Sequence, residues 1–275
     1  MSPATSVLDD IIAGVREDLE QRQREVPWDQ VRDEVEAQPP ALDPMPVFRS
    51  DGVQVIAEVK RASPSKGDLA DIADPAVLAA SYAQAGAAAI SVLTEARRFK
   101  GSLDDLRAVR ARVDVPLLRK DFLVTPYQLW EARAAGADLV LLIVAGLDPS
   151  LLADLHGEAV ALGLTPLVEV HDEREVETAV AAGAQLVGVN ARDLRTLEVH
   201  PDCFSRVAPL LPEGIVRVAE SGITSPADVA DLVSHGADVV LVGETLVRSA
   251  DPGRTLTGLR EAGAAGAARP ARSVL

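Results

Sequence analysis

The stretch ARAAGADLVLLI, from Ala132 to Ile143, contains the end of a helical pattern, a glycine and a short apolar run. Glycine often ends a helix because it adopts the left-handed backbone conformation at low cost, and a bounded apolar run of this length indicates a buried strand. The same pattern begins at three other positions, as YAQAGAAAISVL at Tyr82, AVAAGAQLVGVN at Ala179 and LVSHGADVVLVG at Leu232. The glycines of the four copies lie about fifty residues apart, so the chain repeats a helix–strand unit.

A second set of strand-like runs lies between these copies. They are VQVIAEVK (Val53 to Lys60), VPLLRKDF (Val115 to Phe122), LTPLVEV (Leu164 to Val170) and GIVRVAES (Gly214 to Ser221). Strand-like segments therefore recur about every twenty-five residues, eight in all, with helix-length segments between them. Such alternation is typical of parallel βα units, and eight units predict a single closed (β/α)8 barrel, the TIM barrel. An open doubly wound sheet is the alternative, but its G-x-G-x-x-G fingerprint follows none of the strands.

The chain divides into three predicted parts. Residues 1–46 form an N-terminal extension, with an amphipathic helix whose apolar positions run from Val7 to Leu19 and a proline-rich linker from Pro39 to Pro46. Residues 47–260 form the catalytic barrel, and residues 261–275 form a flexible tail of mostly small side chains. The helix of the extension either lies over one mouth of the barrel or lengthens its core.

The composition narrows the kind of partner. The formal net charge is −15, from 27 basic and 42 acidic residues without a basic cluster, which disfavours nucleic acid and anionic membranes. The longest apolar run, Leu139 to Leu147, is much shorter than the ~20 residues that span a bilayer, and the acidic N-terminus is unlike a secretory signal. A lone cysteine, Cys203, forms no disulfide framework. We expect a cytoplasmic protein, compatible with a monomer, that binds a small molecule.

Polar side chains end the apolar runs at the carboxyl side of the predicted strands. Successive strand residues face opposite sides of the sheet, so residues two positions apart on one strand face the same side. The polar residues that end the runs are therefore expected to face the inside of the barrel. The residues with this placement are Glu58, Lys60, Lys120, Glu169, Asn190 and Glu220. Because burying an unpaired ion costs several kcal/mol and barrel active sites lie at the carboxyl ends, we predict one shared polar site there. Taken singly, residues 119–121 also fit a solvated charge run, and Glu58 with Lys60 fits a structural ion pair.

Three glycine-bearing turns predict a phosphate ligand. They run from Ser63 to Gly67, from Ser221 to Ile223 and from Gly243 to Thr245, after the first, seventh and eighth strands. The last two loops are the usual phosphate site of this fold, because free N–H groups converge there. No metal-ligand spacing is found, and the four histidines are interpreted as scattered surface residues. If Lys60 or Lys120 forms a Schiff base with the substrate, we expect an aldolase. If these lysines and carboxylates act as general acids and bases, we expect a lyase or an isomerase that acts on a sugar phosphate.

Seven motifs together resemble the indole-3-glycerol-phosphate synthase family. They are IAEVKRASPSKG (Ile56 to Gly67), SVLTE with Phe99 and Gly101 downstream, LLRKDFLV (Leu117 to Val124), VEVH (Val168 to His171), GVNARDLRT (Gly188 to Thr196), AESGI (Ala219 to Ile223) and VGETLVRS (Val242 to Ser249). The resemblance runs from about residue 5 to residue 250. It implies a lyase of tryptophan biosynthesis that closes the indole ring of 1-(2-carboxyphenylamino)-1-deoxyribulose 5-phosphate, releasing carbon dioxide and water without a metal or other cofactor.

The resemblance also implies roles for the site residues. Lys120 is implied as the general acid that protonates the substrate ketone, Glu58 and Lys60 as a paired site, and Glu169 as a helper in proton transfer and dehydration. The residues implied to hold hydroxyls, developing charge or an anionic group are Asn190, Glu220, Ser221 and Arg192. Those implied to bind phosphate are Ser63, Gly222, Gly243 and Glu244. Those implied to line the aromatic pocket are Pro64, Phe99 and Phe122.

Ala191 departs from the family, where a second asparagine is common. A related isomerase or aldolase barrel and a noncatalytic phospho-ligand binding protein are the alternative functions.

Overall fold

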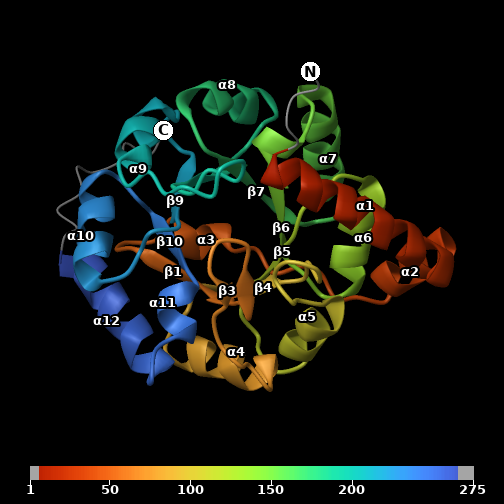
Figure 1. Cartoon of the computed structure of the whole chain (residues 1–275), viewed down its shortest axis with the longest axis horizontal. Coiled ribbons are helices and arrows are strands. Elements are labelled where there is room, and N and C mark those ends of the chain that lie inside the picture. Colours follow the sequence, from red (N-terminus) through yellow and green to blue (C-terminus); the bar gives the residue numbers. More distant parts are fainter. Residues whose placement is uncertain (1–5, 266–275) are drawn as a thin grey trace.

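Figure 1 shows the computed structural model of the chain, which describes residues 6–265. The barrel strands are β1 (Gln54–Val59), β4 (Ala89–Leu93), β5 (Leu117–Lys120), β6 (Leu139–Ile143), β7 (Thr165–Val170), β8 (Leu186–Asn190), β9 (Val216–Glu220) and β10 (Val239–Val242). Within the described residues these eight strands form a closed parallel barrel, in which β1 pairs with both β4 and β10. The predicted (β/α)8 barrel is confirmed. A short antiparallel pair, β2 (Ala62–Ser63) with β3 (Gly67–Asp68), lies in the loop after β1.

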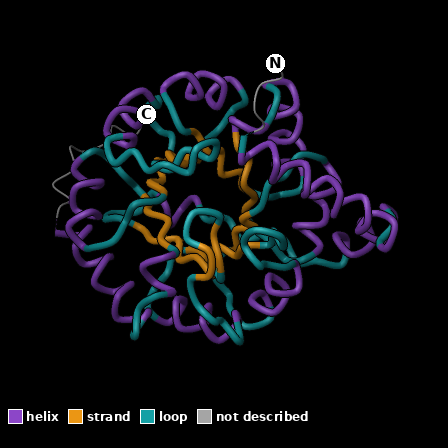
Figure 2. The backbone as a smooth tube through the Cα atoms, in the orientation of Figure 1, coloured by secondary structure: helices purple, strands orange, loops and turns teal. Residues whose placement is uncertain are grey.

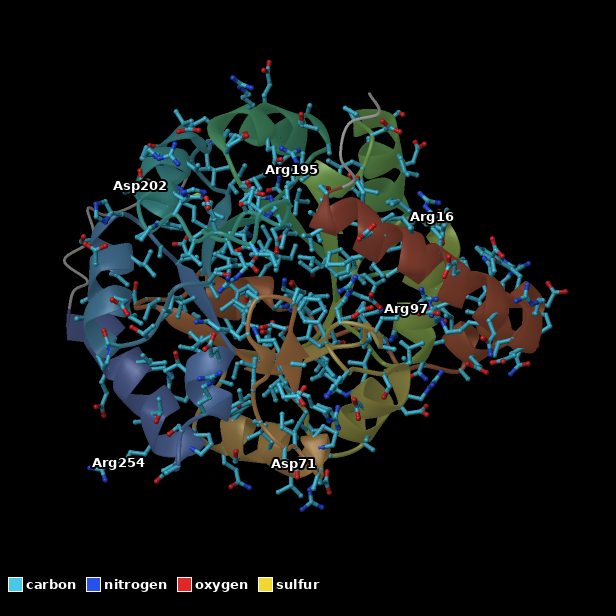
Figure 3. The ribbon with its side chains drawn as sticks, viewed as in Figure 1. Arg16, Asp71, Arg97, Arg195, Asp202 and Arg254 are labelled. Carbon is cyan, nitrogen blue, oxygen red and sulfur yellow. The ribbon has the colours of Figure 1, made fainter. Side chains whose placement is uncertain are left out.

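Helices form a layer outside the ring of strands (Figure 2). They are α4 (Pro75–Gln84), α5 (Leu103–Arg110), α6 (Pro126–Ala134), α7 (Pro149–Ala161), α8 (Glu173–Ala181), α9 (Cys203–Val207), α10 (Pro226–Ser234) and α12 (Pro252–Ala265). Charged side chains such as Asp71, Asp202 and Arg254 lie at the outer edge of the molecule (Figure 3). The shorter elements are α11 (Glu244–Val247) and the 3-10 turns η1 (Val144–Gly146) and η2 (Ala208–Leu210).

The repeated glycines link helices to strands. Gly86, Gly136, Gly183 and Gly236 follow α4, α6, α8 and α10 with φ between 89° and 92°. This left-handed region costs other residues roughly 1–2 kcal/mol, which explains why the four copies share a glycine. The helices also begin at capping residues, since Asp74 accepts hydrogen bonds from the first turn of α4 and Ser225 forms a capping box with Asp228 in α10. The local sequence therefore sets the length of each unit.

Apolar side chains pack on both faces of the barrel strands. Ile56, Leu141 and Leu241 belong to the cluster inside the barrel. Ala57 and Val59, which alternate with the inward positions of β1, pack in the larger cluster with the outer helices. This alternation confirms the predicted parity, and it directs the residues in phase with Ile56 to the interior.

The N-terminal extension contains α1 (Val7–Glu25), α2 (Trp28–Glu36) and α3 (Met45–Phe48). Its first helix, α1, lies at the carboxyl-end mouth of the barrel, whereas Val31 of α2 packs against Tyr127 and Ala134 of α6. In α1, Leu8, Ile11 and Val15 are buried in the same cluster as the barrel interior. Ile11 also lines the cavity at that mouth. Of the two placements that the sequence allowed for this helix, the structure shows the one at the mouth.

The limits of the three predicted parts remain a prediction. The boundary at residues 46 and 47 falls inside α3, and α12 continues to Ala265, through the first five residues of the predicted tail. Residues 266–275 of that tail lie outside the described residues. Between residues 6 and 265, we find no helix with both the length and the apolar character that crossing a membrane requires.

Candidate active site

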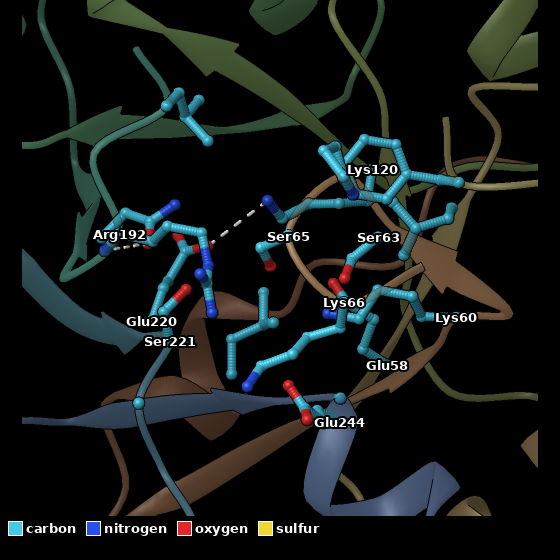
Figure 4. Close-up of a pocket in the computed structure, with 18 of the residues that line it drawn as sticks. Glu58, Lys60, Ser63, Ser65, Lys66, Lys120, Arg192, Glu220, Ser221 and Glu244 are labelled. Carbon is cyan, nitrogen blue, oxygen red and sulfur yellow. Dashed lines mark hydrogen bonds and ion pairs between the residues drawn. The ribbon is translucent and has the colours of Figure 1, made fainter. Parts of the chain in front are cut away.

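A cavity of about 470 Å³ lies at the carboxyl ends of the barrel strands. All the site residues predicted from the sequence line this cavity, and Figure 4 shows several of them from the loops and strands around it. They are Glu58, Lys60, Ser63, Pro64, Phe99, Lys120, Phe122, Glu169, Asn190, Arg192, Glu220, Ser221, Gly222, Gly243 and Glu244. The structure brings the whole set together, while the role of each residue remains a prediction.

The cavity has further lining residues that sequence reasoning missed. Lys66 and Arg248 add positive charge, and Ile11 and Leu194 add apolar surface. Lys66 lies in the turn from Ser63 to Gly67 that was already assigned to phosphate, so its charge could have identified it. Ile11 could not be found in this way, because its place at the cavity depends on how α1 packs.

Lys120 ends β5 and lies between two buried carboxylates. Its Nζ is 3.2 Å from Glu169 Oε2 and 3.5 Å from Glu220 Oε2. Figure 4 shows Lys120 and Glu220 at the cavity. Burial disfavours the ammonium, but Glu169, Glu220 and Glu58 outweigh this effect and raise the pKa of Lys120 above its ordinary value. Lys120 is therefore a cation at neutral pH, and it lines the cavity.

The two carboxylates beside Lys120 differ in their protonation. Burial raises the pKa of Glu220 to about 8, because Lys120 offsets this only in part and the neighbouring carboxylates add to it. Burial acts on Glu169 in the same direction, but Lys120, His171 and Asn190 together hold its pKa well below the usual range. Glu169 has two cationic contacts within 3.2 Å, which is why it takes the negative charge of the pair. The opposite directions of the two shifts place the negative charge of this pair on Glu169.

Glu58 and Lys60 form an ion pair that faces the same cavity. Glu58 Oε1 lies 2.6 Å from Lys60 Nζ, and Ser91 donates a hydrogen bond of 3.3 Å to the other carboxylate oxygen. A side chain at Gly243 would overlap the Glu58 carboxylate and come within 3.1 Å of Lys60 Nζ. Gly188 leaves similar room for the carboxylate of Glu220. The two glycines thus let the charged groups enter the mouth of the barrel.

The turns after β9 and β10 are joined to each other. Ser221 and Gly222 have φ of 66° and 74°, and Thr245 donates a hydrogen bond of 2.6 Å to the carbonyl of Ile223. Left-handed backbone at a residue other than glycine is costly and often marks a functional site. The carboxylate of Glu244 lies 3.5 Å from Arg248 Nε, so a cation is close to this acidic side chain beside the turn.

Arg192 is held by its own loop. Its backbone N–H donates to Asn190 Oδ1 at 3.0 Å, and its guanidinium donates to the carbonyl of Leu197 at 2.9 Å. Arg192 also forms a β-bridge with Val199, which likewise lines the cavity. The loop is therefore a narrow hairpin that places Asn190 and Arg192 on the same wall.

Phe99 and Phe122 form an aromatic wall with ring centroids 6.1 Å apart. Buried Glu95 organises the loop that carries Phe99, because its carboxylate accepts hydrogen bonds of 2.7–2.9 Å from the backbone N–H groups of Arg97, Arg98 and Phe99. Sequence reasoning quoted Glu95 within a motif but gave it no role. The structure assigns it the support of this wall.

We expect Glu95→Gln to raise KM about tenfold with a smaller effect on kcat. A glutamine amide group would face backbone donors, and each hydrogen bond to a charged group is worth about 1.5–3 kcal/mol. Arg97→Gln is the matched control in the same loop. Arg97 lies beside α1 (Figure 3), and its guanidinium forms partly exposed ion pairs with Glu17 and Asp18 of that helix. Steady-state kinetics of both variants test this, and equal KM values would contradict the role of Glu95.

Residues 119–121 are not a solvated charge run. Arg119 points away from the cavity and is 1% exposed, with its guanidinium 2.9 Å from both Asp121 Oδ2 and Glu131 Oε2. Glu131 on α6 also binds Arg22 of α1 at 2.7 Å. Arg119 needs these partners because an unpaired buried charge is strongly destabilising. The network supports β5 directly behind Lys120 and joins it to the extension.

The fold and the site define the class of this protein, a (β/α)8-barrel enzyme with an acid–base centre of lysines and carboxylates at the mouth of the barrel. The family model for indole-3-glycerol phosphate synthase matches residues 8–259. The chain belongs to this family, as its motifs had indicated.

Named relatives are similar over nearly the whole chain. The indole-3-glycerol phosphate synthase of a Nocardioides species is 65% identical over 90% of this chain and 95% of its own length. Indole-3-glycerol phosphate synthase 1 of Streptomyces coelicolor is 60% identical over 98% of this chain and all of its own length. The Mycobacterium tuberculosis enzyme of the same name is 55% identical over 96% of each chain.

Solved structures of other proteins share the fold. Thiamine phosphate pyrophosphorylase from Pyrococcus furiosus has a TM-score of 0.59 and 16% identity, over 78% of this chain and 96% of its own. N-acetylmannosamine-6-phosphate 2-epimerase from Clostridium perfringens has a TM-score of 0.58 and 15% identity, over 74% and 91%. At such low identity these similarities describe the barrel and carry no statement about the reaction.

Proposed function

We propose that this chain converts 1-(2-carboxyphenylamino)-1-deoxyribulose 5-phosphate to indole-3-glycerol phosphate, carbon dioxide and water in tryptophan biosynthesis. The observation that carries the proposal is Lys120, charged and held between Glu169 and Glu220 in a cavity that also contains an aromatic wall and turns suited to phosphate. The family relationship favours this reaction over those of an aldolase or isomerase barrel and over a role in binding alone.

The first step joins the aromatic ring to the ketone. The ring carbon that bears the carboxylate attacks the ketone carbon, and Lys120 gives its proton to the ketone oxygen as that oxygen gains charge. The carboxylate then leaves as carbon dioxide, and its bonding electrons restore the aromatic ring. The cation of Lys60, in contact with Glu58, suits the anionic group that departs.

The second step removes water. The new hydroxyl leaves with a proton supplied by an acid, and a base removes a proton from the adjacent carbon to complete the indole. Ionised Glu169 serves as a base here, and protonated Glu220 donates a hydrogen bond to a substrate hydroxyl together with Asn190 and Ser221. The lysine–carboxylate set thus supplies proton donors and acceptors on one wall.

The rest of the cavity binds the ends of the substrate. Phe99, Phe122 and Pro64 contact the aromatic ring, and Arg192 pairs with an anionic group. The residues proposed to bind the phosphate are Ser63, Gly222, Gly243 and Glu244, with added charge from Lys66 and Arg248. One chain supplies all these groups, so a monomer suffices. We place the enzyme in the cytoplasm, with a small sugar phosphate as its partner and neither nucleic acid nor a membrane, as its net charge of −15 favours.

The direct test incubates the purified protein with this substrate in EDTA, without added metal, and follows indole fluorescence. Turnover is expected without a metal or any other cofactor. Heat-denatured protein controls for uncatalysed ring closure. A folded sample that binds inorganic phosphate but forms no indole would refute the proposed reaction and leave a phosphate-binding barrel.

A further inference from the structure

His171 contacts the catalytic group Glu169 from outside the main cavity. It follows β7 directly, and its Nε2 lies 3.2 Å from Glu169 Oε1. The side chain is only 9% exposed, so the interpretation of His171 as a scattered surface residue is wrong. The other oxygen of Glu169 contacts Lys120 at 3.2 Å. Glu169 therefore bridges a lysine that faces the substrate and a histidine that does not.

The imidazole of His171 is itself held on its far side. Its Nδ1 lies 3.2 Å from Glu175 Oε2, and the same oxygen accepts a hydrogen bond of 2.7 Å from the backbone N–H of His171. The carbonyl of His171 accepts a hydrogen bond of 3.2 Å from the thiol of Cys203. These contacts hold both the backbone and the ring of His171 in place beside Glu169.

The electrostatic surroundings favour the charged imidazole. Burial lowers the pKa of His171, but Glu169 and Glu175 outweigh this and raise it to about 10. A second cavity, of about 190 Å³, lies beside the ring. The charged or titratable residues that line this cavity besides His171 are Asp172, Glu175, Asp193, Arg195, His200 and Arg206. On the other side of Glu169 lie Lys120 and Glu220. The two acidic contacts on the ring are the nearest of these groups.

We propose that His171 is a positioning residue, which acts as an imidazolium to fix the Glu169 carboxylate and keep it ionised as a base for the reaction. This inference rests on the proposed function. It accounts for the second cationic contact of Glu169, which the chemistry at Lys120 does not need. It also gives a role to Glu175, which does not line the main cavity and which completes the row from Lys120 through Glu169 and His171.

The first measurement concerns the charge of the ring and needs no turnover. In a ¹H–¹⁵N spectrum of the imidazole groups at pH 8, both ring nitrogens of His171 are expected to carry protons, although an ordinary histidine, with a pKa of 6.5, is neutral there. The His171→Gln variant assigns the signal. A neutral His171 at pH 8 would overturn the proposal.

The second measurement is kinetic. We expect kcat of His171→Ala and His171→Gln to fall about tenfold, because a catalytic carboxylate that is no longer held in place loses its reactive orientation, while KM changes less than about twofold. Glu175→Gln is expected to act in the same direction with a smaller effect. His200→Ala is the matched control. His200 lines the same second cavity but does not contact Glu169, so this variant is expected to keep the wild-type kcat.

Imidazole added to His171→Ala separates positioning from a structural role. The removed ring leaves space beside the second cavity, so imidazole is expected to restore part of kcat, more strongly relative to wild type at low pH where more of it is protonated. Wild-type kcat in His171→Gln, or a loss of kcat explained by a lower Tm and untouched by imidazole, would refute the proposal. Failure of wild-type protein to form indole would instead refute the proposed function, and the spectrum would still report on the ring.

Discussion

Replacing Lys120 with alanine is expected to lower kcat by at least about 100-fold, the low end for loss of one general acid. Lys120 is the charged group whose Nζ lies between Glu169 and Glu220, and its pKa is raised by these carboxylates. Removal takes away the proposed proton donor for the ketone oxygen and the cation that lies between Glu169 and Glu220. The turns suited to phosphate lie on other strands, so binding of inorganic phosphate is expected to persist.

Two further variants separate proton transfer from charge. Lys120→Arg keeps a cation beside the carboxylates but cannot release a proton at neutral pH, so it is expected to stay far below wild type. Lys100→Gln is the matched control, because Lys100 pairs with Asp68 at the exposed edge of the loops. Near-normal kcat in Lys120→Ala, measured by indole fluorescence, would remove Lys120 from the role of general acid.

The parity of the strands explains why the site was predictable. Glu58, Lys120 and Glu220 each follow an inward apolar residue by two positions, and the carboxyl ends of parallel strands converge on one mouth. Both rules depend only on local geometry and on the closure of the barrel. The phosphate turns are similar, since their glycines and their place after particular strands are visible in the chain.

The groups that support the site depend on tertiary packing. Arg119 is buried because Glu131 on α6 and Arg22 on α1 reach it, and neither contact can be read from residues 119–121. His171 lies one position past the end of β7, two residues after Glu169, where the alternation of a strand no longer fixes the direction of a side chain, yet its ring contacts Glu169. The position of α1 over the mouth likewise follows from contacts between distant segments. Sequence therefore predicts which groups line the cavity better than it predicts what holds them.

Glu169→Gln is expected to lower kcat by at least about 100-fold with little change in KM. Glutamine fills the same space but accepts no proton, so the variant loses the proposed base without losing the shape of the cavity. Lys120 and His171, the two cations that face this carboxylate, each lose one charged partner. Lys120 still has Glu220 at 3.5 Å, and His171 still has Glu175 at 3.2 Å. The pKa of Lys120 and that of His171 should both fall. Glu173→Gln is the control, since Glu173 is an exposed residue that pairs with Arg206.

The effect of Glu169→Gln on stability should depend on pH in a defined direction. The pKa of Glu169 is held below its ordinary value of 4.5, so the folded state binds fewer protons there than the unfolded state. Its contribution to the free energy of unfolding is therefore present above pH 4.5 and lost as the pH falls towards the folded pKa. Urea unfolding of both proteins should show the wild type more stable at pH 7, with the difference shrinking below about pH 4.5. A difference that stays constant with pH would show that the carboxylate is not stabilised in its charged form.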